Sequence, residues 1–290
     1  MTEYIEPRRI RKFREDLIKK IPRFPNNRIT QKLLEEKSLV DLLLVYVTWA
    51  SRFVPPRPRR IHIEPSLTAG RRWNSLSATT KTLFDKVRCG DNLTAYLSLK
   101  IFKKGFRPNP PPTNVTLDKW ADKDFLLNVM GYHHFHLSHI LEPNGSVKRT
   151  DTVLFAKLTR AEFTAIGYFD HSVFESSKVE GQPLKSERQR LWDIFLARSR
   201  QNIPRGSVYV PAVIMTSGHS MNHVRLADRY AEIIYETDSK LDDAAYLSSL
   251  FGATEKVGSH VKPVWCINYL DLGILDTQQN AFCILQKGPI

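Results

Sequence analysis

Residues 131–175 decide the fold, and they read GYHHFHLSHILEPNGSVKRTDTVLFAKLTRAEFTAIGYFDHSVFE. Near the start of this stretch, His134, His136 and Ser138 alternate with apolar residues. A period of two is the signature of a β-strand, because successive side chains of a strand point to opposite faces. The three polar side chains are therefore expected on one face of a strand.

Two apolar runs, residues 153–158 and 163–169, follow this strand and are separated by a short polar turn. Runs of this length that are rich in aromatic and branched residues predict two further strands. Consecutive strands joined by short turns pair antiparallel, so one end of the sheet would gather polar side chains from all three. These side chains are His134, His136, Arg149 and His171.

The residue types in this set suit RNA cleavage without a metal. That reaction needs a base for the ribose 2′-hydroxyl, a cation for the charge on the phosphorane, and an acid for the departing 5′-oxygen. Histidine transfers protons near neutral pH, and arginine is a fork-shaped donor to phosphate oxygens. Five of the nine histidines of the chain lie in residues 131–175. We therefore expect a phosphodiester-cleaving site.

Other uses of the same residues stay open. His134 and His136 share a strand face and could hold zinc or manganese with His139 or His171 as a third ligand. A two-histidine phosphoesterase needs paired His-x-Ser/Thr motifs, and the second candidate motif, at residues 219–221, lacks the hydroxyl residue. The histidines could also be ordinary polar residues of a strand end.

Two short motifs resemble RelE/YafQ-type ribonuclease toxins, which belong to the barnase–EndoU–colicin–RelE fold group. Residues 134–137, His-Phe-His-Leu, resemble the family strand x-H-x-I/L, and residues 169–174, Phe-Asp-His-Ser-Val-Phe, resemble its closing G-S-H-S-x-x-F. The resemblance covers residues 118–176, with a longer insert at residues 139–148 than the family carries. It implies a metal-independent endoribonuclease without a cofactor, a toxin or phage-defence effector that cleaves mRNA or tRNA, and an antitoxin protein as partner.

The resemblance also implies a role for each residue of the site. His134 or His136 would be one proton-transfer group and His171 the other. Arg149 would hold the phosphate, and Asp170 would orient His171. An aromatic ring, Phe174, would stack on a base of the substrate.

The positive charge of the chain is concentrated in its first third. Residues 1–112 contain 24 Lys and Arg against 10 Asp and Glu, whereas the remainder contains 19 against 20. A one-sided basic surface attracts polyanions, so RNA or the ribosome is the expected partner, with a merely solvated basic face or an anionic lipid as the alternatives. Five arginines of this region are expected to bind substrate: Arg57, Arg59, Arg60, Arg71 and Arg72.

Cysteine content and hydropathy indicate a cytoplasmic protein that does not use a membrane. The three cysteines are far apart and form neither a disulfide framework nor a metal-binding pair. The first residues lack the apolar core of a signal peptide. The longest apolar stretch, residues 39–50, is too short to span a bilayer.

The expected fold class is α+β: a basic helical N-terminal region followed by a mainly antiparallel sheet flanked by helices. A run of prolines at residues 108–112 coincides with the change in charge and predicts a boundary. We expect residues 1–112 to be basic and mainly helical, residues 113–180 to be the RelE-like β-rich catalytic core, and residues 181–290 to be an α/β extension that packs on it. Outside the core, helices are expected at residues 7–22, 29–52, 77–87, 91–102, 118–130, 186–200 and 222–240, and strands at residues 60–64, 208–215, 264–270 and 281–285.

Overall fold

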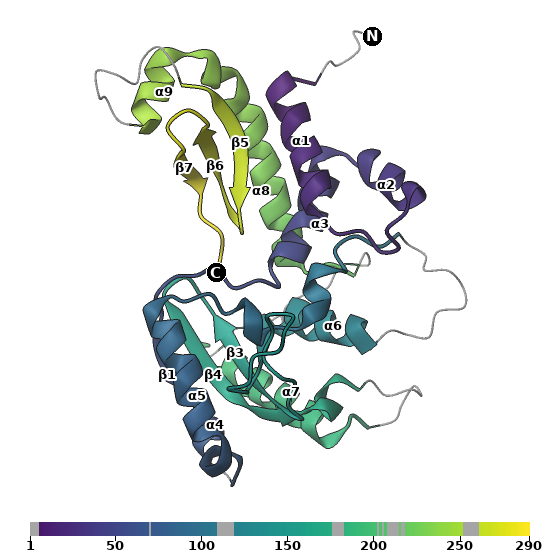
Figure 1. Ribbon diagram of the computed structural model, residues 1–290, viewed down its shortest axis with the longest axis vertical. Coiled ribbons are helices and arrows are strands. Elements are labelled where there is room, and N and C mark those ends of the chain that lie inside the picture. Colours follow the sequence, from purple (N-terminus) through teal and green to yellow (C-terminus); the bar gives the residue numbers. More distant parts are fainter. Residues whose placement is uncertain are drawn as a thin grey trace. The chain divides into compact units, whose positions relative to one another are not determined.

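A computed structural model describes residues 6–69, 71–108, 119–175, 183–201, 203–204, 206–207, 215, 218–251 and 261–290, without the side chains of residues 71, 99 and 119–124 (Figure 1). The chain divides into two compact units. Unit 1 comprises residues 1–51, 102–110 and 222–289, and unit 2 comprises residues 52–101, 111–221 and 290. This division differs from the expected boundaries at 112/113 and 180/181, because both ends of the chain contribute to unit 1.

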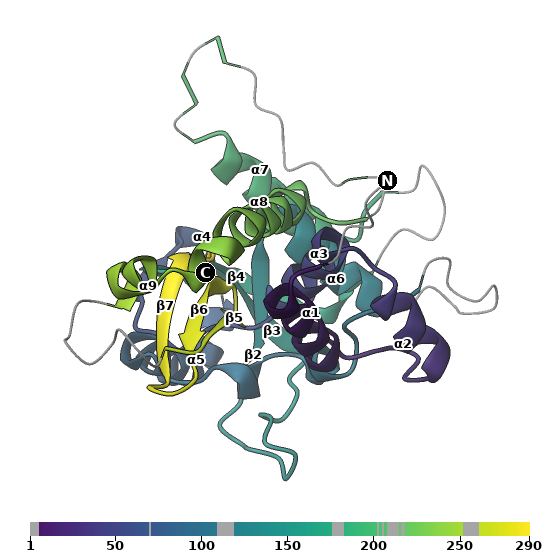
Figure 2. The same ribbon diagram turned by 90° about the horizontal axis from the view of Figure 1, so that it is seen from above.

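Unit 1 combines helices with a three-stranded antiparallel sheet of order β5-β6-β7. Its elements are α1 (Arg8–Lys20), α2 (Arg28–Glu35), α3 (Leu39–Ala50), α8 (Met221–Thr237), η4 (Asp238–Asp242), α9 (Ala244–Phe251), β5 (Pro263–Asn268), β6 (Asp271–Asp276) and β7 (Ala281–Gln286). Helix α8 runs alongside this sheet in both views (Figures 1 and 2).

Local sequence explains the buried face of α1 and the start of α3. Helix α1 buries Ile10, Phe13 and Leu17, which share one face at helical spacing. The expected helix at residues 29–52 is two helices, because Ser38 caps a new one: its Oγ accepts a hydrogen bond from the Asp41 amide at 3.1 Å.

Unit 2 is built on a four-stranded sheet of order β1-β4-β3-β2, in which only β1 and β4 are parallel. Its elements are β1 (Arg60–Ile63), α4 (Pro65–Thr68), α5 (Arg71–Cys89), η1 (Thr94–Tyr96), η2 (Leu99–Phe102), α6 (Lys119–Met130), β2 (Tyr132–His136), β3 (Thr152–Leu158), β4 (Glu162–Asp170), η3 (His171–Phe174) and α7 (Ser186–Ser199). The expected α+β class is confirmed. A basic helical N-terminal region precedes a mainly antiparallel sheet along the chain.

Helices cover both faces of the unit 2 sheet. On one face, Phe155 and Phe169 join a buried cluster with side chains of α6 and α7, among them Leu126 and Leu191. On the other face, the ring of Phe163 packs against Phe84 of α5, with centroids 6.0 Å apart. The central strands are therefore buried on both sides, which agrees with their nearly continuous apolar sequence.

Two expected elements were wrong, and others fall outside the described residues. Residues 91–102 form two short 3-10 helices instead of one α-helix. The expected pair of C-terminal strands has a third strand, β6, between them. A Cβ at Gly273 of this strand would lie 2.0 Å from the Cys283 carbonyl oxygen, so glycine permits the close contact between β6 and β7. Residues 208–214 of the expected strand and 109–112 of the proline run are not described.

No helix in the described part of the chain combines the length and the apolar composition that crossing a bilayer requires.

Candidate functional site

Three histidine rings meet at one end of the unit 2 sheet. Strand β2 places His134 and His136 on the same face, with ring centroids 6.1 Å apart. His171 begins η3, directly after β4, and its ring lies 5.9 Å from that of His136 with the planes 28° apart. His133 lies on the opposite face, where its ring stacks with Phe135. The structure thus brings together the three histidines expected to act on RNA.

The three histidine rings differ in their exposure to solvent, and therefore in whether they can reach a substrate. His136 is only 2% exposed, whereas His134 and His171 are half-buried. Phe174 packs against His134 with centroids 4.9 Å apart and is itself 4% exposed. The expected stacking of Phe174 on a substrate base is therefore wrong in this conformation, because the ring belongs to the core that supports the histidines.

A backbone carbonyl fixes the tautomer of His171. Its Nε2 lies 3.1 Å from the carbonyl oxygen of Thr150. Because a carbonyl oxygen only accepts hydrogen bonds, Nε2 carries the proton and donates it to Thr150. In the neutral ring Nδ1 is then unprotonated and can receive a proton, as a general base requires. The role of Thr150 was not predictable from the sequence, because every residue type has a backbone carbonyl that can accept this hydrogen bond.

Asp170 positions His171 indirectly. Its Oδ1 accepts hydrogen bonds from the amide of Ser172 at 3.0 Å and from the Ser172 hydroxyl at 2.5 Å, so it caps the start of η3. Its Oδ2 pairs with Arg72 at 3.3 Å. Burial alone raises the pKa of Asp170, but the Ser172 hydrogen bonds and the Arg72 charge outweigh it and lower the pKa. The expected direct contact with His171 is replaced by these two partners.

Arg72 is engaged in an ion-pair network. Its Nη1 lies 2.8 Å from Glu187 Oε2, and the same oxygen accepts hydrogen bonds from the amide of Asp170 at 3.1 Å and from Arg190 at 3.0 Å. Burial raises the pKa of Glu187, but its hydrogen bonds from Arg190 and Arg72 lower it below the ordinary value. Arg72 thus ties α5 to the end of β4, and its charge is shared with Glu187 and Asp170. The side chain of Arg71 lies outside the described residues.

Arg149 is the expected cation best placed for substrate. It is exposed, it forms no ion pair with the described residues, and it directly precedes Thr150, the acceptor of His171. An exposed guanidinium on this segment can neutralise a phosphate that approaches from solvent.

The remaining arginines lie at the other end of the sheet. Arg60 pairs with Glu162, the first residue of β4, at 3.5 Å, whereas His171 follows the last residue of that strand. Nine residues of strand separate these ends by about 30 Å. Arg60, which is exposed, and Arg57, which is half-buried, therefore lie too far from the histidines to bind the same phosphate.

Arg59 is buried, in contrast to its expected role at the surface. It is 4% exposed and donates to the carbonyl oxygens of Thr159 at 2.9 Å and Pro55 at 3.0 Å. Burial, and then the charges of Arg57 and Arg160, lower its pKa to about 10. This arginine joins the chain before β1 to the β3–β4 turn.

No group of three or more His, Cys, Asp or Glu is arranged to hold a metal ion in the part of the chain that the structure describes. Comparisons with protein-family models, with curated proteins and with solved structures found no match. The function is therefore inferred from the chemistry of the site alone.

Proposed function

We propose that this chain is a cytoplasmic, metal-independent endoribonuclease, a toxin or phage-defence effector that cleaves mRNA or tRNA. One observation supports it above the others: His171, with its Nε2 proton directed to Thr150, lies against His136, and the exposed Arg149 directly precedes Thr150. Proton-transfer groups, and a cation that has no ion-pair partner among the described residues, are the parts that phosphodiester cleavage needs.

The chemistry is a transesterification within the RNA. Nδ1 of His171 removes the proton of the ribose 2′-hydroxyl, and the 2′-oxygen forms a bond to phosphorus. A protonated histidine, His134, gives its proton to the 5′-oxygen as the bond from phosphorus to that oxygen breaks. Arg149 neutralises charge on the non-bridging oxygens in the transition state. The products are a 2′,3′-cyclic phosphate and a 5′-hydroxyl, and no cofactor takes part.

The remaining residues of the site hold this arrangement in place. Buried His136 supports the ring of His171, and the Asp170 cap fixes where η3 starts. Both act through His171 and need no contact with the substrate. A toxin of this kind also requires a partner protein that restrains it, and we propose an antitoxin as that partner.

The test is an incubation of purified protein with structured and unstructured RNA in the presence of EDTA. Sequencing of the products, with chemistry that detects cyclic-phosphate and 5′-hydroxyl ends, should show new ends for the wild type. His171→Ala protein should give none. If well-folded wild-type protein leaves the RNA uncut, the ribonuclease proposal is wrong. If EDTA abolishes cleavage, a metal-dependent hydrolase is favoured.

A second candidate is a non-catalytic protein that binds RNA or the ribosome. It is favoured by the burial of His136 and Phe174, since both rings would serve packing alone in such a protein. In that case His171→Ala would leave RNA binding and any growth phenotype unchanged. The same comparison of wild type and variant therefore separates the two candidates.

A further inference from the structure

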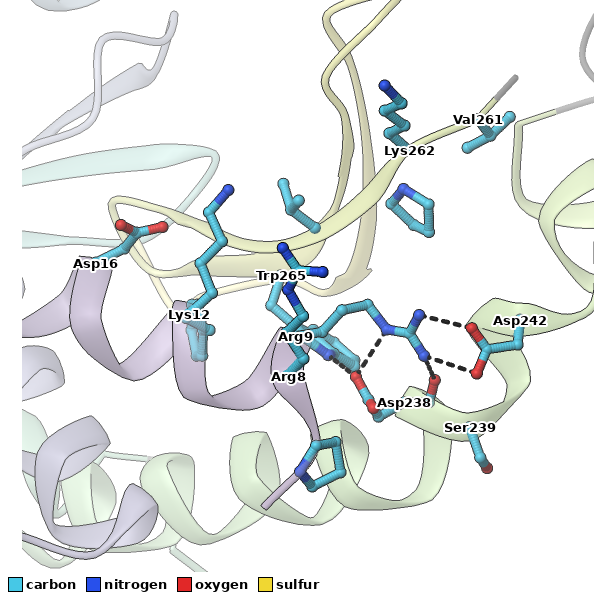
Figure 3. A pocket seen from close by; sticks show the side chains of 14 residues that line it. Arg8, Arg9, Lys12, Asp16, Asp238, Ser239, Asp242, Val261, Lys262 and Trp265 are labelled. Carbon is cyan, nitrogen blue, oxygen red and sulfur yellow. Dashed lines mark hydrogen bonds and ion pairs between the residues drawn. The ribbon is translucent and has the colours of Figure 1, made fainter. Parts of the chain in front are cut away.

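Unit 1 contains a cleft of about 690 Å³ whose walls come from three separate stretches of the chain. The first two turns of α1, the η4 turn and the start of β5 line it (Figure 3). Its volume lies within the ordinary range of ligand-binding pockets, roughly 300–1,000 Å³. None of the residues that line it belongs to the histidine site.

One wall is a hydrogen-bonded network that holds Arg9. The guanidinium of Arg9 binds Asp242 at 2.7 and 3.1 Å and Asp238 at 3.2 Å. Asp238, 5% exposed, also accepts a hydrogen bond from the Trp265 indole at 2.7 Å. These contacts join α1, η4 and β5 (Figure 3). Arg9 therefore stabilises unit 1 and is not available to a ligand.

The neighbouring cations have no such role. Arg8 and Lys12 lie one turn apart on α1, are exposed, and form no ion pair with the described residues. Figure 3 shows both extending from the helix toward β5. The first turn of α1 contains no acidic residue, and a cation there is unfavourable beside the positive end of the helix dipole. Helix stability thus does not explain Arg8.

Further positive charge continues past the cleft. Arg11 and Lys19 are exposed on the same helix, and Lys262 lines the cleft from the residue before β5. From Arg8 to Lys19 the helix rises by roughly 16 Å. A row of cations of this length exceeds a single small phosphorylated ligand and suits the repeated phosphates of a nucleic acid strand.

We propose that the cleft and the exposed face of α1 bind the phosphate groups of a single RNA strand, so that unit 1 recruits substrate. The choice of RNA rests on the proposed ribonuclease function, whereas the phosphate contact rests on the cations of the cleft. Asp16 also lines the cleft, but its carboxylate lies 3.8 Å from Lys19 and is partly compensated.

The test is a binding titration with a fluorescent single-stranded RNA in which every 2′-hydroxyl is methylated, so that cleavage is blocked. Wild type is compared with the triple variant Arg8→Gln, Arg11→Gln, Lys12→Gln over a range of salt concentrations. Each lost contact to a single strand lowers the slope of log K against log salt by about 0.7. The variant should therefore show a slope shallower by about 2 and bind at least tenfold more weakly at about 0.1 M salt.

The matched control removes three exposed cations elsewhere in unit 1: Arg28→Gln, Lys32→Gln, Lys103→Gln. Its slope of log K against log salt should stay within about 0.7 of the wild-type slope, which corresponds to the loss of at most one phosphate contact. An equal loss in both triple variants, or no loss in the α1 variant, would overturn the proposal in favour of diffuse attraction or of no contact at all. All these side chains are exposed, so the melting temperature should not move; if it does, Arg8→Gln alone should still lower the slope.

Because the RNA is uncleavable, the outcome does not depend on catalysis. If the wild-type protein binds the methylated RNA as expected but does not cleave unmodified RNA, this inference is supported and only the proposed ribonuclease function is wrong. Displacement of the RNA by inorganic pyrophosphate at the same molar concentration as the RNA would overturn the RNA-binding inference. It would assign the cleft to a small phosphorylated ligand.

Discussion

His136 and His171 lie with their ring centroids 5.9 Å apart and their planes 28° from parallel. One ring comes from β2, at the edge of the sheet, and the other from η3, which follows β4. His136 is buried and His171 is half-exposed, so the inner ring supports the outer one. The outer ring has its Nε2 directed to the Thr150 carbonyl, which leaves its second nitrogen for proton transfer.

Replacing His171 separates positioning from chemistry. His171→Gln can still donate a hydrogen bond to Thr150 but cannot transfer a proton, and His171→Ala can do neither. Both should lower the initial rate of RNA cleavage by about 10²–10⁴-fold, the usual contribution of a general acid or base. The glutamine variant should melt closer to the wild-type temperature than the alanine variant, which thermal unfolding measures.

His139→Ala is the control, because His139 is exposed on the segment after β2 and takes no part in the ring cluster. It should cleave RNA at the wild-type rate. If it lost as much activity as the His171 variants, the cluster would not be the site.

The strands of the candidate site were predictable because their signal is local. Alternation over residues 134–138 depends only on the geometry of a strand, and it placed His134 and His136 on the same face. The convergence with His171 followed from antiparallel pairing of three consecutive strands. No contact distant in sequence was needed for either step.

Burial and pairing at the same site were not predictable, since they depend on distant partners. Arg72 is held by Glu187, 115 residues away, and Arg59 by Thr159, 100 residues away. The division into two units differs from the expected boundaries for the same reason: Arg9 binds Asp238 across 229 residues, so α1 lies in the same unit as the C-terminal strands. Composition gives the position of charge along the chain but not its partner in space.

Arg149→Ala should reduce RNA cleavage by at least about 10²-fold, because a cation near the transferring phosphate stabilises charge that develops in the transition state. Arg149 is exposed and has no ion-pair partner among the described residues, so the free energy of unfolding should change by less than about 0.5 kcal/mol. Arg149→Lys should recover part of the rate. Steady-state kinetics and urea unfolding measure the two quantities, and a rate that does not move would exclude a role for this arginine.

Glu187→Gln should destabilise the protein by about 2 kcal/mol at pH 7, because it replaces the carboxylate that accepts hydrogen bonds from Arg72, Arg190 and the Asp170 amide. The folded-state pKa of Glu187 is lowered, so its contribution is present above the unfolded pKa and is lost as the pH falls through the folded pKa. The difference between variant and wild type should shrink below about pH 4. Urea unfolding at several pH values tests this, and a difference that grew toward acid would contradict it.

Asp238 and Asp242 bind the same guanidinium in very different surroundings, and their alanine variants should differ accordingly. The side chain of Asp238 is 7% exposed and that of Asp242 is 73% exposed. Asp238→Ala removes the buried carboxylate to which Arg9 and the Trp265 indole donate, while Arg9 keeps the backbone carbonyl of residue 238 and Asp242. It should cost about 1–3 kcal/mol of unfolding free energy, chiefly for the buried indole N–H that loses its acceptor. Asp242→Ala removes a partner in water, where an ion pair contributes at most about 1 kcal/mol. Urea unfolding followed by tryptophan fluorescence gives both values. Equal losses would mean that the network does not hold α1 against η4 and β5, and that Arg9 is no more committed than Arg8.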